Sequence, residues 1–478
     1  MPAARPDTGS LRADAAIVGG GLAGMVAAAR ACELGRSVVV LEAGPEGPYP
    51  CNVRYSGGVL HVAFCDIKSP PDVLLRAIAE RTAGQADPAQ AEAVARNAGR
   101  LVDWMRMQGV AFTHAAVGWQ SHILAPSRAI AAGQDWRDRG PDVMLRTMAD
   151  RIRERGGRIL TGTRARSLIM REGRCAGVVA SAPGGPLTIE AGAVILADGG
   201  FQANRELVGR HIAARPERLK QRGGGTGMGD GLRMAEEAGA EITRLDCFYG
   251  HLLCRDAMHN DNVWPYPELD ALALAGLLVD ASGERFFDEG LGGVALANAL
   301  ARHADPLSGW AVFDHAIWEG PGRSARIPAN PTLETAGGTI LRAASIAEIA
   351  GLAGISPVGL SQTVAAHNGA LRSNDWSGLA PPRTIERHRP MPIATPPYMA
   401  IPVCAGITYT MGGIRVDGSS RVLRPDGRGI PGLYAAGSTT GGLEGGETAG
   451  YIGGLAKAGV QGLLAAEHIA AMQQGPAS

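Results

Sequence analysis

The chain has 478 residues, 45% of them hydrophobic and 19% charged, which is enough for a large buried core and predicts two domains. Lys plus Arg and Asp plus Glu each number 46, so the formal net charge is zero. This balance argues against a partner that is recognised by overall charge, and we expect neither nucleic acid nor an anionic membrane surface.

Seven cysteines are spread through the chain without regular spacing. No C-x-x-C pair occurs, so iron–sulfur, c-type haem and dithiol centres are not indicated, and we predict no metal site. No run of about eighteen apolar residues predicts a membrane span, and the first residues lack the apolar region of a signal peptide. The sequence therefore predicts a soluble, cytoplasmic protein.

The first predicted unit is a strand, a glycine turn, a helix and a second strand over residues 15–42. Its two apolar runs have the length and β-branched content of buried parallel strands. Between them Gly19, Gly21 and Gly24 have the G-x-G-x-x-G spacing, which allows a tight turn, close approach to a pyrophosphate and close helix–strand packing. Glu42 ends the second strand, where its carboxylate can accept hydrogen bonds from both hydroxyls of a ribose.

Helical spacing of apolar residues predicts helices over residues 72–108 and 143–155. Several strands follow, and the last is an apolar strand over residues 193–197. A glycine-rich loop, residues 223–231, then leads into a helix, near whose start the carboxylate of Asp230 is electrostatically favourable.

Two further segments combine a polar residue with two glycines: Ser56-Gly57-Gly58 and Asp198-Gly199-Gly200. Such segments let the backbone approach a flat or bulky ligand closely. In a flavoprotein the first of them would lie against the isoalloxazine ring.

The character of the chain changes between about residues 242 and 392, where aromatic and histidine side chains cluster around a predicted strand–turn unit at 277–289. We interpret this stretch as an inserted domain that covers the substrate. The chain then returns with a predicted strand pair over 407–417, a short buried strand over 431–437, and a final helix that begins near residue 453.

In this order, the segments resemble the flavoprotein family of fumarate reductase and succinate dehydrogenase, which also holds tricarballylate dehydrogenase and the 3-ketosteroid dehydrogenases. The positions that carry the resemblance are Glu42, Ser56-Gly57-Gly58, Ala197-Asp198-Gly199-Gly200, Gly229-Asp230-Gly231 and the GLYAAG stretch at 432–437. The resemblance implies an α/β fold with a Rossmann-like, two-point FAD-binding domain and an inserted α+β capping domain. The predicted divisions are 12–241 and 393–470 for the FAD-binding domain, 242–392 for the capping domain, and flexible tails at 1–11 and 471–478.

The resemblance also implies FAD that is not covalently attached. Covalent members use a histidine just before the Gly-Gly loop, where this chain has Arg54-Tyr55-Ser56. FAD would lie extended from Glu42 past Ser438 to the start of the final helix, whose dipole stabilises reduced flavin. The residues expected to bind it are Gly19, Gly21, Leu22, Ala23, Gly24, Glu42, Ala43, Asn52, Ser56, Gly57, Gly58, Ala165, Asp198, Gly199, Asp230, Gly437, Ser438, Leu455 and Ala456.

Two departures from the fumarate reductases change the expected chemistry. Their proton-donating arginine lies four residues after the glutamate of an R-F-x-x-E segment, which is Arg285–Glu289 in this chain, and that position is Gly293. Their late carboxylate-binding arginine aligns with Tyr451, a phenol that has no charge at neutral pH. The 3-ketosteroid dehydrogenases also have a tyrosine there, which polarises a ketone together with a backbone amide.

We therefore predict a dehydrogenase that desaturates the carbon–carbon bond next to a carbonyl. Tyr451 and the Leu455 amide would polarise the carbonyl, while Tyr409 handles the α-proton as hydride leaves the β-carbon for flavin N5. The alternative proton acceptors are Tyr249 and His251. The remaining predicted substrate residues are Gly413 and Arg54.

Two other functions stay open in the sequence. One is a tricarballylate dehydrogenase or fumarate reductase-like enzyme acting on a small di- or tricarboxylate, for which Arg54 and Arg255 are available. The other is an electron-transferring flavoprotein subunit of a larger complex. In each case the substrate is expected to be a small molecule, and the electron acceptor could be oxygen, a quinone or a protein.

Overall fold

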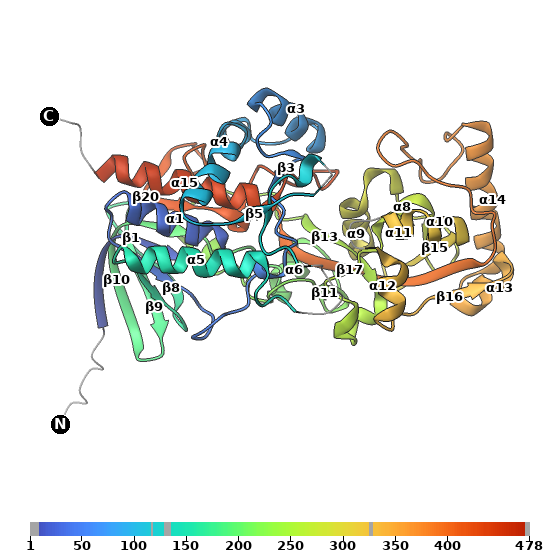
Figure 1. Ribbon diagram of the computed structural model, residues 1–478, viewed down its shortest axis with the longest axis horizontal. Coiled ribbons are helices and arrows are strands. Elements are labelled where there is room, and N and C mark those ends of the chain that lie inside the picture. The colour runs from blue at the N-terminus through green and yellow to red at the C-terminus, as the bar shows by residue number, and fades with distance from the viewer. Residues whose placement is uncertain (1–8, 116–117, 129–134, 325–327, 474–478) are drawn as a thin grey trace.

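The computed structural model describes residues 9–115, 118–128, 135–324 and 328–473. The molecule is elongated and has two parts, and both chain ends lie on the same part (Figure 1). Of the predicted tails, residues 9–11 belong to the first strand and 471–473 to the last helix, while the rest of both tails lies outside the described residues.

The first part is built on an eight-stranded sheet with the order β19-β20-β10-β1-β2-β7, to which β9 and β8 are added beside β10. Its strands are β1 (Gly9–Val18), β2 (Val38–Leu41), β7 (Arg158–Leu160), β8 (Arg164–Arg171), β9 (Arg174–Ala182), β10 (Gly185–Leu196), β19 (Arg421–Leu423) and β20 (Gly429–Ala435). Strand β1 pairs in parallel with β2 and β10, as the predicted nucleotide-binding unit requires. The last four residues of β1 and all of β2 are buried, which explains their continuous apolar runs.

Helix α1 packs against both α15 and α5, and the three helices lie beside this sheet (Figure 1). The helices of the first part are α1 (Leu22–Glu33), α2 (Asn52–Tyr55), α3 (Pro71–Arg81), α4 (Pro88–Met107), α5 (Gly140–Glu154), α6 (Arg205–His211), α7 (Asp230–Glu237) and α15 (Gly454–Gln473). The single helix predicted over residues 72–108 is divided into α3 and α4. Gly84 has a φ of +74° between them, and Pro88 begins the second helix.

The second part contains a six-stranded sheet with the order β11-β17-β15-β14, and β13 and β16 also pair with β17. Its strands are β11 (Lys220–Gln221), β13 (Phe248–Cys254), β14 (Leu277–Val279), β15 (Trp310–Asp314), β16 (Leu341–Ala343) and β17 (Tyr398–Thr410). Its helices are α8 (Asp270–Ala275), α9 (Gly293–Arg302), α10 (His315–Glu319), α11 (Pro321–Ser324), α12 (Ala329–Thr335), α13 (Ile346–Ala353) and α14 (Pro357–Ser373).

Strand β17 begins deep in the second part and ends at the junction of the two parts (Figure 1). It pairs with β15 and β16 at its start and with β13 along its second half. The predicted division near residue 392 lies just ahead of this strand, so the second sheet also uses residues beyond the predicted division.

One local prediction is wrong. The strand pair over residues 407–417 does not form: β18 (Gly413–Arg415) pairs with β12 (Ile242–Thr243) and β21 (Thr440–Gly441) instead of β17. A Cβ at Gly412 would overlap the carbonyl oxygen of Arg244, so this turn is packed against another segment and leaves the β17 sheet. The predicted strand–turn unit at 277–289 is present: β14 ends at Val279, a turn with a hydrogen bond from the Gly283 amide to the Asp280 carbonyl follows, and an isolated bridge joins Val279 to Arg285.

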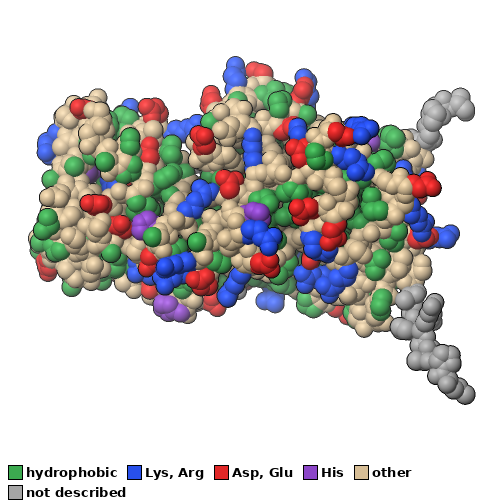
Figure 2. All heavy atoms as spheres, turned by 180° about the vertical axis from the view of Figure 1, so that it is seen from behind, with side chains coloured by type: hydrophobic (Ala, Val, Ile, Leu, Met, Phe, Trp, Pro, Cys, Tyr) green, Lys and Arg blue, Asp and Glu red, His purple; other side chains and the backbone are tan. Residues whose placement is uncertain are grey.

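The remaining small strands are β3 (His61–Val62) paired with β4 (Cys65–Asp66), and β5 (Phe112–Thr113) paired with β6 (Ile123–Leu124). Among the described residues, no helix combines the length and apolar content needed to cross a membrane. The face in Figure 2 carries Lys and Arg side chains interspersed with Asp and Glu, without an extended region of one sign. A cytoplasmic location stays a prediction.

Candidate active site

A cavity of about 770 Å³ extends from the glycine turn after β1 to the loops of the second part. All of the predicted cofactor residues line it except Gly24 and Ala456. The four predicted catalytic residues, Tyr249, His251, Tyr409 and Tyr451, line its other end. The structure thus brings the two predicted groups of residues into one continuous space.

The carboxylate of Glu42 is fixed at the end of β2 by two backbone amides. Its Oε2 accepts a hydrogen bond from the amide of Gly20 at 2.7 Å, and its Oε1 accepts one from the amide of Gly44 at 2.6 Å. Burial raises the pKa of Glu42, and the two amide hydrogen bonds oppose that shift. Each carboxylate oxygen can accept a further hydrogen bond, which leaves capacity for hydroxyl groups of a nucleotide.

The glycines of the turn differ in what surrounds them. A Cβ at Gly24 would overlap the carbonyl oxygen of Gly19, so this glycine lets α1 approach β1 closely. Gly19 has a φ of +107°, which favours glycine in the tight turn. Nothing lies within 4 Å of the Cβ position at Gly21. The backbone of the turn therefore forms an open cradle in front of α1, which fits a pyrophosphate group.

Asp198 and Asp230 meet at the start of α7. Asp198 Oδ2 accepts a hydrogen bond from the amide of Gly231 at 2.7 Å, and Asp230 forms a two-point ion pair with Arg164 at 2.7 and 3.0 Å. Burial raises the pKa of Asp198 to about 6, against the effect of the Gly231 amide. Both aspartates thus have protein partners and hold the wall of the cavity in place.

Three tyrosine rings pack together at the other end of the cavity, with Tyr249 and Tyr451 stacked and Tyr409 tilted against Tyr249. The ring centroids of Tyr249 and Tyr451 are 4.1 Å apart, and those of Tyr249 and Tyr409 are 5.2 Å apart. Burial raises the pKa of all three phenols above the ordinary value. They are therefore neutral hydrogen-bond donors at neutral pH.

His251 connects Tyr249 to a carboxylate that the sequence analysis missed. Its Nε2 is 2.9 Å from the Tyr249 hydroxyl, and its Nδ1 is 2.5 Å from Oδ2 of Asp270. Asp270 is the first residue of α8, and its other oxygen accepts the amide of Leu252 at 2.8 Å. No spacing in the sequence indicates this pair, because the histidine and the aspartate lie 19 positions apart, in β13 and at the start of α8.

Arg222 was also missed, although it directly precedes the predicted glycine loop. It is buried and contacts Glu268, while its Nε donates to the carbonyl of Pro265 at 3.0 Å. Glu268 lies 3.5 Å from Nε2 of His251. The ligand atoms of His251, Glu268 and Asp270 all lie within 4.8 Å of one another, but each of these side chains already has a protein partner.

Tyr409 is held by a buried ion pair. Its hydroxyl donates to the two carboxylate oxygens of Glu444 at 3.1 and 3.2 Å, and Lys457 Nζ lies 3.4 Å from the same carboxylate. Glu444 and Lys457 are 0% and 1% exposed. The carboxylate raises the pKa of Tyr409 beyond the effect of burial, which argues against the prediction that Tyr409 accepts the α-proton.

Besides Gly24, three predicted ligand-binding residues do not line the cavity. Arg54 is buried elsewhere, with its Nε 2.7 Å from Asp142. Gly413 lies in β18, where a Cβ would overlap the carbonyl oxygen of Thr439. Ala456 is fully buried in the first turn of α15. Arg54 and Gly413 are both occupied by contacts within the protein, which argues against the prediction that they contact the substrate.

Gly293 begins α9, and its lack of a side chain has a structural reason. A Cβ at this position would overlap the carboxylate of Asp270. The place where fumarate reductases were expected to carry an arginine is thus taken by the aspartate that binds His251.

The parallel sheet, the open glycine turn and the covered cavity define a dinucleotide-binding enzyme. The sequence matches the FAD binding domain family over residues 14–452, and the chain belongs to this family. FAD is its cofactor, and the open cradle at Gly21 and the fixed carboxylate of Glu42 fit the pyrophosphate and ribose of that group. The chain is an FAD-dependent oxidoreductase.

The relatives include reductases and a steroid dehydrogenase, and both kinds support the predicted family resemblance. The chain is 28% identical to NADH:acrylate oxidoreductase of Vibrio harveyi over 73% of its own length and 34% of that protein. It is 26% identical to fumarate reductase (cytochrome) of Shewanella frigidimarina over 90% of its length and 72% of that protein. It is 31% identical to 3-oxosteroid 1-dehydrogenase of Mycobacterium tuberculosis over 58% of its length and 52% of that protein.

A solved structure shares the fold. The 3-ketosteroid delta1-dehydrogenase of Sterolibacterium denitrificans superposes with a TM-score of 0.73 at 21% sequence identity, covering 96% of this chain and 100% of the other. The predicted fold class, FAD-binding with a covering part, is confirmed.

Proposed function

We propose that this oxidoreductase desaturates a carbon–carbon bond next to a ketone. The observation that carries the proposal is Tyr451, a neutral phenol stacked on Tyr249 in front of the first turn of α15. FAD, when bound, accepts the hydride that leaves the β-carbon. The chain itself has to polarise the ketone and remove the α-proton.

Polarisation is supported by the start of α15. The first amides of a helix have no intrahelical partner and lie at the positive end of its dipole. The Tyr451 hydroxyl lies within hydrogen-bonding reach of the Gly454 amide. Tyr451 and the neighbouring Leu455 amide can therefore both donate to one ketone oxygen. Two fixed donors stabilise the negative charge that develops there more strongly than they stabilise the neutral ketone.

Proton removal is supported by the chain of contacts from Tyr249 to Asp270. Tyr249 would take the α-proton as its own proton moves to Nε2 of His251, 2.9 Å away. Asp270, 2.5 Å from Nδ1, then stabilises the charged imidazole. A base that is oriented by a third group is the usual arrangement for activating a weakly acidic hydroxyl. Tyr409 does not fill this role in the proposal, because it donates to Glu444.

The observations favour a ketone over fumarate as the group that reacts. Tyr451 is uncharged, and Gly293 cannot donate a proton. Arg54 and Arg255 do not line the cavity.

The test is flavin bleaching without oxygen, using cyclic ketones on one side and succinate and tricarballylate on the other. We expect bleaching by a cyclic ketone, and Tyr451→Phe should slow it by about 10²–10³-fold because one of two donors is lost. Tyr434→Phe is the matched control, since this phenol binds His468 and does not line the cavity. Bleaching by the carboxylates alone, or a Tyr451→Phe variant that reacts at the wild-type rate, would contradict the proposal.

A further inference from the structure

A loop between α14 and β17 brings three adjacent basic residues, Arg387, His388 and Arg389, to the cavity. Within the described chain, no hydrogen bond or ion pair joins Arg389 or His388 to another residue. Arg387 donates to the backbone carbonyl of Glu80 in α3 at 2.7 Å, which leaves its charge without a carboxylate partner. Positive charge is therefore available to a ligand at this position.

The other arginines of the cavity differ in this respect. Arg164 lies 2.7 Å from Asp230, and Arg222 contacts Glu268. These two charges are already compensated within the protein. Arg389 thus stands out among the lining arginines, and its guanidinium has free donors in the fork geometry that binds a carboxylate.

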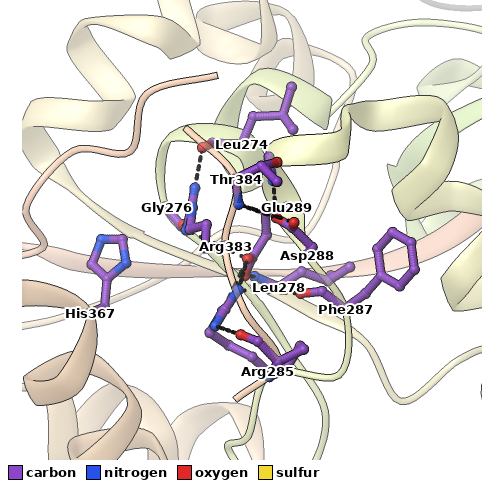
Figure 3. Close-up of polar contacts among 12 residues, drawn as sticks. Leu274, Gly276, Leu278, Arg285, Phe287, Asp288, Glu289, His367, Arg383 and Thr384 are labelled. Atoms are coloured by element: carbon purple, nitrogen blue, oxygen red, sulfur yellow. Dashed lines mark hydrogen bonds and ion pairs between the residues drawn. The ribbon is translucent and has the colours of Figure 1, made fainter. Parts of the chain in front are cut away.

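The loop is fixed on its N-terminal side by a buried charged cluster (Figure 3). Glu289 is fully buried and accepts hydrogen bonds from Arg285 at 3.0 Å, and Arg383 lies 3.6 Å from the same carboxylate. Arg383 also donates to the carbonyl of Gly276 at 2.9 Å. The Arg285–Glu289 segment, which marked the family resemblance, therefore holds the chain just before the loop.

The next contacts complete the attachment. The amide of Thr384 donates to Asp288 at 3.0 Å, and on the C-terminal side the amide of Met391 donates to the carbonyl of Ala275 at 2.8 Å. His367 lies 2.8 Å from the carbonyl of Met391 through Nε2, and burial lowers its pKa to about 4, so the neutral ring donates this hydrogen bond. Only residues 385–390 lie between these attachments, so the basic side chains extend from a short segment with fixed ends. Such preorganisation lowers the entropic cost of binding.

The loop also lies close to the proposed catalytic residues. His388 Nε2 is 3.3 Å from the Cβ position of Gly292, and the Asp270 carboxylate occupies the Cβ position of the adjacent Gly293. Apolar side chains that line the cavity, Val294 among them, belong to the same region. A compact apolar ligand can therefore contact the reaction centre with one end and the basic loop with the other.

We infer that the substrate is a ketone that also carries a carboxylate, and that Arg389, assisted by Arg387 and His388, binds this carboxylate. The inference rests on the proposed function, because it places the ketone at Tyr451. It narrows the proposed substrate of this cavity from ketones in general to ketones that carry a carboxylate. A neutral cyclic ketone would offer no carboxylate to Arg389, whose exposed guanidinium would then be paired only with water.

The experiment compares 4-oxocyclohexane-1-carboxylate with 4-oxocyclohexane-1-carboxamide, which has the same shape without the charge. The purified holoenzyme should reduce its flavin with the carboxylate at a kcat/KM about 10- to 150-fold higher than with the carboxamide, because a hydrogen bond to a charged group changes affinity by this factor. The double variant Arg387→Gln/Arg389→Gln should abolish the preference, mainly through KM. Arg389→Lys should retain part of it, since the charge stays but the fork is lost.

The matched control is Arg372→Gln, an exposed arginine of α14 that does not line the cavity, and this variant should keep the wild-type preference. Equal kcat/KM for the two probes in the wild type, or a preference that survives in the double variant, would overturn the inference. If neither probe reduces the flavin, the proposed function fails. In that case the carboxylate site is tested separately, by the shift of the flavin spectrum when cyclohexanecarboxylate or cyclohexanecarboxamide binds. Binding of the acid that is lost in the double variant supports the carboxylate site. Equal binding of acid and amide overturns it.

Discussion

The two ends of the cavity are built in different ways. The nucleotide end uses the backbone of one continuous stretch, β1 to β2, with a single carboxylate, Glu42, held by two amides. The substrate end uses side chains from β13, α8, β17 and the loop before α15. The nucleotide end thus requires only a local backbone conformation, whereas the substrate end depends on which side chains pair with each other. Five experiments test this contrast.

The largest effect should come from the side-chain network. His251→Gln removes the group that takes the proton from Tyr249, and we expect single-turnover flavin reduction by the best ketone to fall by about 10²–10⁴-fold. Asp270→Asn should give a smaller loss, because the imidazole keeps its place but loses the opposite charge. FAD content should match the wild type in both variants. An unchanged rate in His251→Gln would show that the α-proton leaves by another route.

The buried ion pair of Glu444 and Lys457, which contacts Tyr409, should contribute to the free energy of unfolding. Lys457→Met leaves the buried carboxylate of Glu444 without its cation, and removing one partner of a buried pair typically costs about 3–5 kcal/mol in unfolding free energy. Denaturant unfolding of the holoenzyme measures this loss. The double variant Glu444→Gln/Lys457→Met should recover much of it, since no uncompensated charge stays buried. A double variant as unstable as the single one would show that packing, and not charge, sets the cost.

The nucleotide end should respond through affinity for FAD. Glu42→Ala removes a charged acceptor, which costs about 1.5–3 kcal/mol per hydrogen bond and weakens binding by about 10- to 150-fold. Titration of the apoprotein with FAD measures the change. Glu46→Ala is a useful control, because this acid is exposed on the loop after β2. Equal FAD affinity in Glu42→Ala and wild type would contradict the role of this carboxylate.

A smaller effect is expected at Gly293. Gly293→Ala places a methyl group where the Asp270 carboxylate lies, and such overpacking typically costs about 1–3 kcal/mol. We expect a lower thermal unfolding temperature together with slower flavin reduction, because Asp270 is displaced from His251. Gly351→Ala, at an open position in α13, should change neither property. A fully active, stable Gly293→Ala variant would show that Asp270 can move without consequence.

We expect FAD to be bound without a covalent link to the protein. Acid denaturation should release all yellow colour as FAD, and the mass of the denatured chain should equal that of the sequence. The segment before the glycine pair, Arg54-Tyr55-Ser56, contains no histidine that could form the link. Colour that stays with the pellet, or FMN in the supernatant, would contradict this prediction.

The sequence alone was sufficient for the nucleotide end. Gly19, Gly21, Gly24 and Glu42 act through backbone conformation and a strand end, and such features depend on neighbours in the chain. The choice of Tyr451 came from the family resemblance, and its catalytic role stays a prediction. The break between α3 and α4 was missed, although Gly84 and Pro88 mark it, because apolar periodicity alone does not detect a short turn.

Only the tertiary structure decided which charged side chains are available. Arg54 appeared suitable for a substrate carboxylate, but Asp142, 88 residues further along the chain, neutralises it. Asp270 gained its proposed role because folding places it beside His251, and Arg389 is available because folding gives it no carboxylate partner. The strength of an ionic group depends on its partners and its exposure to water, and both are set by contacts between segments that are distant in the sequence.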